Sequence, residues 1–154
     1  NSLGWKQTFT VDFYGKCSSD YAPVFMKKID AMENVNYRGM LDFSHRSAYD
    51  TLASYHAMLF PTFWKGEGFA GVFIDAYIAG LPIITTDWGH NKSILGENAY
   101  YIPPRDADAL TNIMKEVIDG EKDLDSLSLR MQLEVEKYNV SNVITEKLLN
   151  QIDL

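Results

Sequence analysis

The stretch of the chain that decides its fold covers residues 60–91 and reads FPTFWKGEGFAGVFIDAYIAGLPIITTDWGHN. It opens with a glycine-rich loop, and the apolar run after this loop has the length of a helix that ends at Gly80. Residues 81–86, LPIITT, are rich in β-branched side chains and predict a buried strand. A strand, loop, helix and strand in this order are typical of a parallel α/β architecture.

Strand-like and helix-like segments also alternate on both sides of this stretch. Strands are predicted over residues 8–14, 36–41, 57–61, 81–86 and 99–102. Helices are predicted over residues 20–32, 44–55, 69–79, 107–118, 124–136 and 140–152. This alternation predicts an α/β fold with a Rossmann-like parallel sheet flanked by helices. Because no repeat or long linker interrupts the pattern, residues 1–154 are predicted to form a single domain.

Composition narrows the class of protein. The 154 residues are 46% hydrophobic and 23% charged, as in a globular domain, and the net charge of −7 argues against broad nucleic-acid binding. With Cys17 as the single cysteine and no metal-ligand spacing at His45 and His56, we expect a reducing, cytoplasmic setting, no cofactor and no obligatory metal. Residues 68–86 have the length of a membrane span, but Asp75, Gly80 and Pro82 interrupt them, so a switch from helix to strand explains them better.

The loop after the third predicted strand is the main candidate for a binding site. Ligands of open parallel sheets bind beyond the carboxyl ends of the strands. In this loop Gly66, Gly68 and Gly71 surround Glu67 directly before a helix. Glycine allows a ligand to approach the backbone, and the first turn of a helix offers unpaired N–H groups, which together suit a phosphate or a sugar hydroxyl. A plain turn before the helix is the alternative.

Asp75 adds a second carboxylate eight residues after Glu67, in a helix that is otherwise apolar and therefore expected to be buried. A buried carboxylate is costly without partners. It either faces the ligand and accepts hydrogen bonds from a diol, or it bonds internally to backbone or to a tyrosine hydroxyl. Asn91 follows the strand over residues 81–86, where it contacts a ligand or orders the loop.

These residues resemble the signature of retaining, GT-B-fold, family-4 glycosyltransferases. Glu67-Gly68-Phe69 matches the Glu-Gly-Phe opening, Asp75-Ala76 stands where Glu-Ala is usual, and residues 80–82, Gly-Leu-Pro, match Gly-x-Pro. The resemblance extends over nearly the whole chain and is nearest to capsule, exopolysaccharide and O-antigen enzymes. One departure is that no Arg…Lys pair for clamping a diphosphate is visible at the first strand.

The resemblance implies the donor-binding, C-terminal lobe of such an enzyme, with the N-terminal acceptor lobe absent from residues 1–154. It implies a catalytic role for Glu67 near the anomeric carbon of the donor sugar and a ribose contact for Asp75. The other implied donor-binding residues are Gly39, Met40 and Leu41 along the nucleobase, Gly66, Gly68 and Phe69 at the sugar or phosphate, and Asn91.

The implied activity is hexose transfer from a nucleoside diphosphate sugar to a growing glycan or lipid-linked acceptor in polysaccharide biosynthesis. The implied location is the cytoplasm, with the full-length enzyme peripheral at the inner face of the membrane. The chain alone is expected to be inactive because the cleft needs both lobes. A non-catalytic α/β module that binds a nucleotide, or supports a partner, is the alternative, and it predicts no preference for a sugar nucleotide over a free nucleotide.

Overall fold

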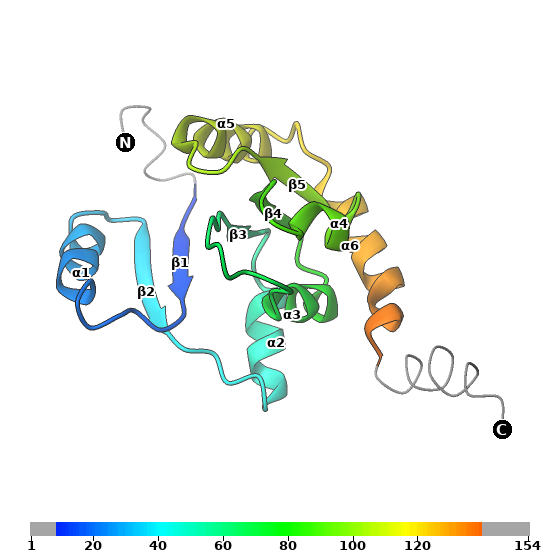
Figure 1. The fold of residues 1–154 in the computed structure, drawn as a ribbon, viewed down its shortest axis with the longest axis horizontal. Coiled ribbons are helices and arrows are strands. Elements are labelled where there is room, and N and C mark those ends of the chain that lie inside the picture. Colours follow the sequence, from blue (N-terminus) through cyan, green and yellow to red (C-terminus); the bar gives the residue numbers. More distant parts are fainter. Residues whose placement is uncertain (1–8, 140–154) are drawn as a thin grey trace, which may run out of the picture. The chain divides into compact units, whose positions relative to one another are not determined.

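The computed structural model describes residues 9–139, in which parallel strands alternate with helices (Figure 1). This confirms the predicted α/β class. The chain forms two compact units, Asn1–Ala48 and Tyr49–Leu154, and the boundary falls within α2 (Arg46–Ala53). The prediction of a single domain stays a prediction.

The first unit pairs β1 (Val11–Tyr14) with β2 (Val35–Gly39) in parallel, and α1 (Ala22–Asp30) connects them. α1 lies beside this two-stranded sheet (Figure 1) because Phe25 packs edge-on against Phe13 at 5.3 Å and Tyr37 at 5.6 Å. β2 ends at Gly39, whose positive φ of 79° favours glycine.

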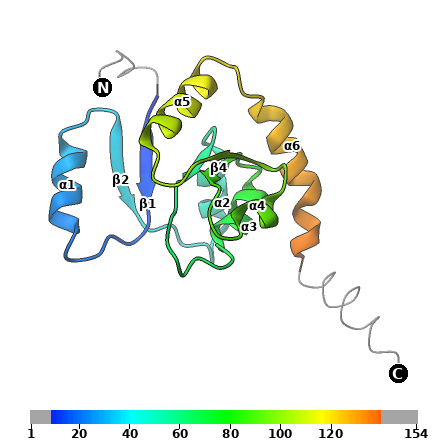
Figure 2. The same cartoon turned by 45° about the horizontal axis from the view of Figure 1, so that its top comes forward.

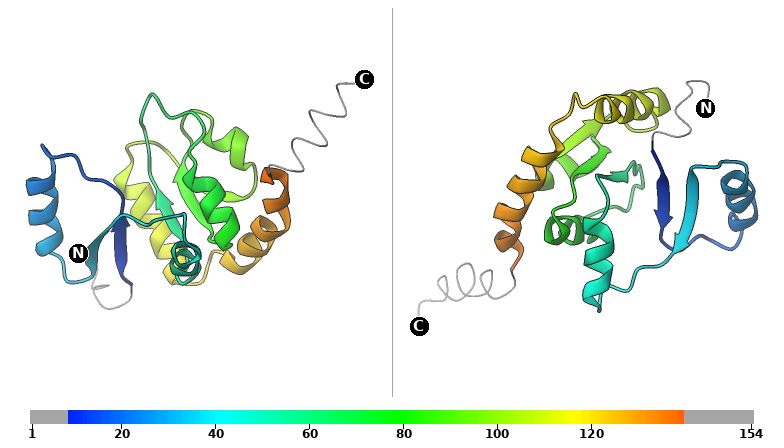
Figure 3. Two further views of the ribbon diagram at one scale, coloured as in Figure 1. Left: turned by 90° about the horizontal axis from the view of Figure 1, so that it is seen from below. Right: turned by 180° about the vertical axis from the view of Figure 1, so that it is seen from behind.

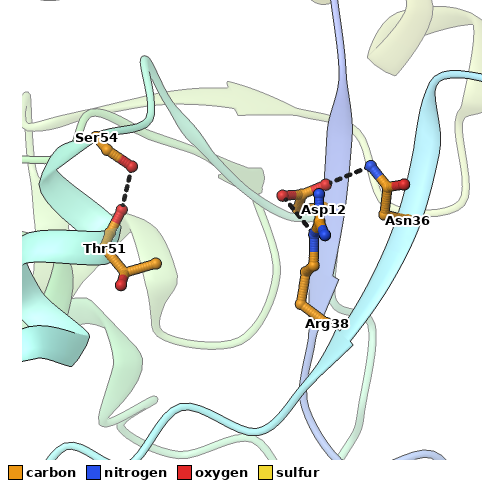
Figure 4. Close-up of polar contacts among 5 residues, drawn as sticks. All are labelled: Asp12, Asn36, Arg38, Thr51 and Ser54. Carbon is orange, nitrogen blue, oxygen red and sulfur yellow. Dashed lines mark hydrogen bonds and ion pairs between the residues drawn. The ribbon is translucent and has the colours of Figure 1, made fainter.

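Polar side chains also join the two strands of the first unit (Figure 4). Asn36 Nδ2 donates to Asp12 Oδ1 at 2.7 Å, and Arg38 Nε donates to Asp12 Oδ2 at 3.0 Å. Figure 4 also shows a separate bond of the second unit, in which Ser54 Oγ donates to the Thr51 carbonyl at 2.6 Å at the end of α2.

The second unit contains a parallel sheet in the order β3-β4-β5, formed by Met58–Phe60, Ile83–Thr86 and Ala99–Ile102. The central strand, β4, is buried along its whole length. Ile84 forms a core with Ile102 of β5 and Ile113 of α5 (Ala107–Ile118), the helix that covers β5 (Figure 2).

Two further helices complete the second unit. α3 (Val72–Ala79) packs against α6 (Leu124–Glu134), which continues as the 3-10 turn η1 (Val135–Tyr138) (Figure 3). α3 also packs on β3 through an edge-on contact of Phe73 with Phe60 at 5.3 Å. Gly80 ends α3, as the sequence predicted, and adopts the left-handed conformation that favours glycine.

The structure corrects several details of the sequence interpretation. α3 begins at Val72 rather than at residue 69, so Asp75 lies in its first turn, where the helix dipole favours a carboxylate. Ile78, which was expected to be buried with the rest of this apolar helix, is 49% exposed. A short helix that was not predicted, α4 (Asn91–Leu95), follows β4. The helix predicted over residues 140–152 lies outside the described residues.

Within residues 9–139, no helix combines the length and apolar character that crossing a bilayer requires.

Candidate functional site

The loops that follow β3, β4 and β5 meet at the carboxyl edge of their sheet. Trp88, after β4, donates its indole N–H to the Trp64 carbonyl in the loop after β3 at 2.9 Å. Arg105, after β5, lies over the ring of Phe63 with its guanidinium carbon 4.8 Å from the ring centroid. The three loops are therefore neighbours in the structure.

Glu67 is held in a hydrogen-bonded turn of the loop after β3. The hydroxyl of Thr62 donates to Glu67 Oε2 at 3.1 Å and accepts the backbone N–H of Trp64 at 3.2 Å. The Glu67 N–H donates to the Trp64 carbonyl at 3.1 Å. The carbonyl of Thr62 accepts a hydrogen bond from the hydroxyl of Thr86 on β4. The half-buried Glu67 carboxylate is thus connected to the central strand.

The backbone directly after Glu67 is open. Gly68 and Phe69 are exposed, and a Cβ at Gly68 would meet no atom within 4 Å. Within the described part of the chain, the N–H groups of these two residues donate no hydrogen bond. Two free N–H groups next to a fixed carboxylate suit a ligand that carries both acceptor oxygens and hydroxyl groups.

One carboxylate oxygen of Asp75 accepts a hydrogen bond within the protein, and the other is available to a ligand. The Tyr49 hydroxyl donates to Asp75 Oδ1 at 3.2 Å, which is the internal bond considered from the sequence. Asp75 Oδ2 accepts no hydrogen bond from the described residues. Burial raises the pKa of Asp75, and burial together with the nearby Asp75 carboxylate raises the pKa of Tyr49.

Asn91, at the start of α4, is only 1% exposed. Its Nδ2 donates to Thr85 Oγ1 and to the Thr86 carbonyl, each at 3.2 Å, so it ties α4 to the end of β4. Its Oδ1 is buried and has no hydrogen-bond partner among residues 9–139. The geometry supports the loop-ordering role, and the contact of Asn91 with a donor stays a prediction.

Three of the predicted site residues belong to the first unit. Gly39 is the last residue of β2, Met40 is exposed and Leu41 is half-buried. Their predicted contact with a nucleobase stays a prediction, whereas Glu67, Gly68 and Phe69 are adjacent in one loop of the second unit.

The sequence reasoning missed the residues that position the two carboxylates. Thr62 lies just beyond the half-buried strand β3 and Thr86 ends the buried strand β4, and hydroxyl side chains at these places were the available signal. Tyr49 is 26 residues from Asp75, and no local pattern relates the two. Residues 9–139 contain no group of three or more His, Cys, Asp or Glu side chains that could hold a metal ion.

Residues 5–120 match the family model described as glycosyl transferases group 1. The match covers most of the chain, so the chain belongs to this family. This agrees with the resemblance to family-4 glycosyltransferases. None of the curated protein sequences matches the chain significantly.

Solved structures show the same fold at low sequence identity. HepE from Anabaena, in complex with UDP-glucose, is 16% identical with a TM-score of 0.71, and the match covers 92% of this chain and 41% of that one. TarM is 17% identical with a TM-score of 0.69, covering 94% and 29%. The pneumococcal O-GlcNAc transferase GtfA, in complex with UDP and GlcNAc, is 21% identical with a TM-score of 0.61, covering 92% and 28%.

The chain therefore spans less than half of the length of these structures. Its fold is that of one lobe of a GT-B glycosyltransferase, as the sequence predicted.

Proposed function

We propose that this chain is the donor-binding, C-terminal lobe of a retaining glycosyltransferase that moves a hexose from a nucleoside diphosphate sugar to a growing glycan. The observation that carries the proposal is the fixed Glu67 carboxylate beside the free N–H groups of Gly68 and Phe69. The complete enzyme acts in polysaccharide biosynthesis, in the cytoplasm or at the inner face of the membrane.

Each part of the loop has a chemical task in this reaction. As the diphosphate departs, negative charge grows on its oxygens and positive charge grows at the anomeric carbon. The N–H groups of Gly68 and Phe69, with the positive end of α3 behind them, hold sugar hydroxyls or phosphate oxygens. The carboxylate of Glu67 stabilises the positive charge of the sugar, and the bond from Thr62 keeps it in place without reorganisation.

Asp75 and the residues after β2 hold the nucleoside part of the donor. Asp75 Oδ2 accepts from the ribose hydroxyls, while Tyr49 holds Oδ1. Gly39, Met40 and Leu41 lie along the nucleobase. The acceptor is bound by the second lobe of the complete enzyme, so residues 1–154 alone catalyse no transfer.

The comparisons support a uridine nucleotide as the first donor to test. HepE was solved with UDP-glucose, and GtfA with UDP and GlcNAc. These ligands belong to proteins that share the fold at 16% and 21% identity, so they guide the choice of probe.

The test is a calorimetric titration of the complete enzyme, with both lobes, against UDP, UDP-glucose and UDP-N-acetylglucosamine. The proposal expects tighter binding of one sugar nucleotide than of UDP, and loss of that preference in Glu67→Ala. Glu121→Ala is the matched control because Glu121 is an exposed glutamate beyond the end of α5. Equal affinity for UDP and both sugar nucleotides would favour the non-catalytic nucleotide-binding module instead.

A further inference from the structure

Exposed aromatic side chains gather in the loop after β3. Phe63 is 47% exposed, Phe69 is 48% exposed and Trp64 is 71% exposed. The ring of Phe63 has the Arg105 guanidinium over it, and Phe69 makes an edge-on contact with Tyr138. The ring of Trp64 has no aromatic or cationic partner among the described residues. Its surface is the most open of the three.

The backbone of Trp64 is nevertheless fixed. Its N–H donates to the Thr62 hydroxyl at 3.2 Å. Its carbonyl accepts from the Glu67 N–H at 3.1 Å and from the Trp88 indole at 2.9 Å. These three bonds belong to the turn that also positions Glu67, so the indole and the carboxylate are held by one rigid piece of backbone.

Gly66 explains where the indole lies. A Cβ at Gly66 would be 2.7 Å from Trp64 Nε1, closer than real Cβ contacts, so the indole folds over the glycine that precedes Glu67. Trp64 Nε1 donates to no acceptor within residues 9–139. The turn therefore presents a flat apolar ring and an N–H donor, and the same turn carries the Glu67 carboxylate as an acceptor.

This combination matches the chemistry of a pyranose ring, which has an apolar face of C–H groups and a rim of hydroxyl groups. Aromatic side chains contribute large, rigid contact area together with a polar edge. We infer that Trp64 is a stacking subsite for a pyranose ring of one of the two substrates. In this subsite the C–H face packs on the indole, and Nε1 and Glu67 bind hydroxyls. The inference rests on the proposed function and extends it to a residue beyond the family signature.

The ring belongs either to the donor or to the acceptor, and the test separates the two. Complete polypeptide is prepared as wild type, Trp64→Ala and Trp64→Phe, with Leu133→Ala as a control because Leu133 is an equally exposed apolar side chain on α6. Each protein is titrated with UDP and with UDP-glucose and UDP-N-acetylglucosamine. Each is also examined by saturation-transfer NMR with the methyl glycosides of glucose, galactose and mannose.

For a donor ring, Trp64→Ala weakens sugar-nucleotide binding about tenfold and leaves UDP unchanged. For an acceptor ring, sugar-nucleotide affinity is unchanged, and saturation transfer to the C–H protons of a methyl glycoside is lost. In both cases Trp64→Phe retains most of the binding and Leu133→Ala is neutral.

The inference would be overturned if Trp64→Ala binds like the wild type in every titration and every NMR experiment. It would also be overturned if the only effect of Trp64→Ala is a lower melting temperature. The second result would indicate that the indole packs against protein. If the wild type binds neither UDP nor a sugar nucleotide, the proposed function fails; if it binds them and Trp64→Ala is unaffected throughout, the subsite alone fails.

Discussion

Replacing Thr62 by valine tests whether the loop after β3 holds Glu67 for sugar binding. Valine has nearly the shape of threonine but lacks the hydroxyl that donates to Glu67 Oε2 at 3.1 Å and accepts the Trp64 N–H at 3.2 Å. The change therefore removes two hydrogen bonds and leaves the packing of the loop against β4 in place.

The two lost bonds have separate consequences. A hydrogen bond to a charged acceptor is worth about 1.5–3 kcal/mol, and the half-exposed Glu67 lies at the low end of this range. We therefore expect sugar-nucleotide affinity to fall about tenfold. Both bonds are present in the folded protein without ligand, so the unfolding free energy should fall as well, by about 1.5–2.5 kcal/mol in this exposed turn.

The assay compares affinities for UDP-glucose, UDP-N-acetylglucosamine and UDP, together with a thermal melt, for wild type, Thr62→Val and Thr62→Ser. Thr62→Ser keeps the hydroxyl and should bind sugar nucleotides as the wild type does. UDP affinity should be the same in all three proteins, because UDP lacks the donor hexose that Glu67 contacts. Equal loss of UDP and sugar-nucleotide binding in Thr62→Val, or no loss of either, would refute the positioning role.

Two further substitutions test the carboxylate in α3 and the core. Burial raises the pKa of Asp75 above its ordinary value of 3.8, so between the unfolded and native values the native state holds more protons and stability falls as pH rises. Asp75→Asn should therefore be at least as stable as the wild type at pH 7, and melts between pH 4 and 8 should show that its stability no longer falls as pH rises. Its affinity for UDP should be roughly 10- to 100-fold weaker. Lower stability with unchanged UDP binding would assign Asp75 a purely structural role with Tyr49. Ile84→Asp places a charge at a core position that is 2% exposed, so it should abolish the cooperative thermal transition, and a soluble, cooperatively melting variant would contradict the assigned core.

The sequence predicted the elements whose limits are set by local signals. β5 and α5 begin and end at the predicted residues, because prolines follow the strand and Asp106 caps the helix through the Ala109 N–H at 2.8 Å. The start of α3 was placed too early because Phe69 and Ala70 continue the apolar run. In the structure Phe69 instead contacts Tyr138, far along the chain.

The position of Ile78 could not be predicted for a related reason. Seven of the eight residues of α3 are apolar, so periodicity does not indicate which side faces the protein. The short helix α4 was missed because its sequence has no apolar periodicity. Its start is fixed by Asn91, whose side-chain amide donates hydrogen bonds to Thr85 and Thr86.

The candidate site was predictable where its residues are contiguous and unpredictable where they are not. Glu67, Gly68 and Phe69 stand together in the sequence and in the structure. The Tyr49 hydroxyl reaches Asp75 from a different helix, and the Trp88 indole crosses between two loops, so both depend on tertiary packing that carries no local signature.

Hydrogen exchange at the loop after β3 tests the central claim, that the backbone after Glu67 holds the donor, most directly. The complete polypeptide is labelled with deuterium alone, with UDP and with the sugar nucleotide that binds most tightly in titration. The account predicts that the amides of Gly68 and Phe69, which donate no hydrogen bond within the described residues, become protected when the sugar nucleotide binds. Unchanged exchange at these two amides under saturating sugar nucleotide would contradict it.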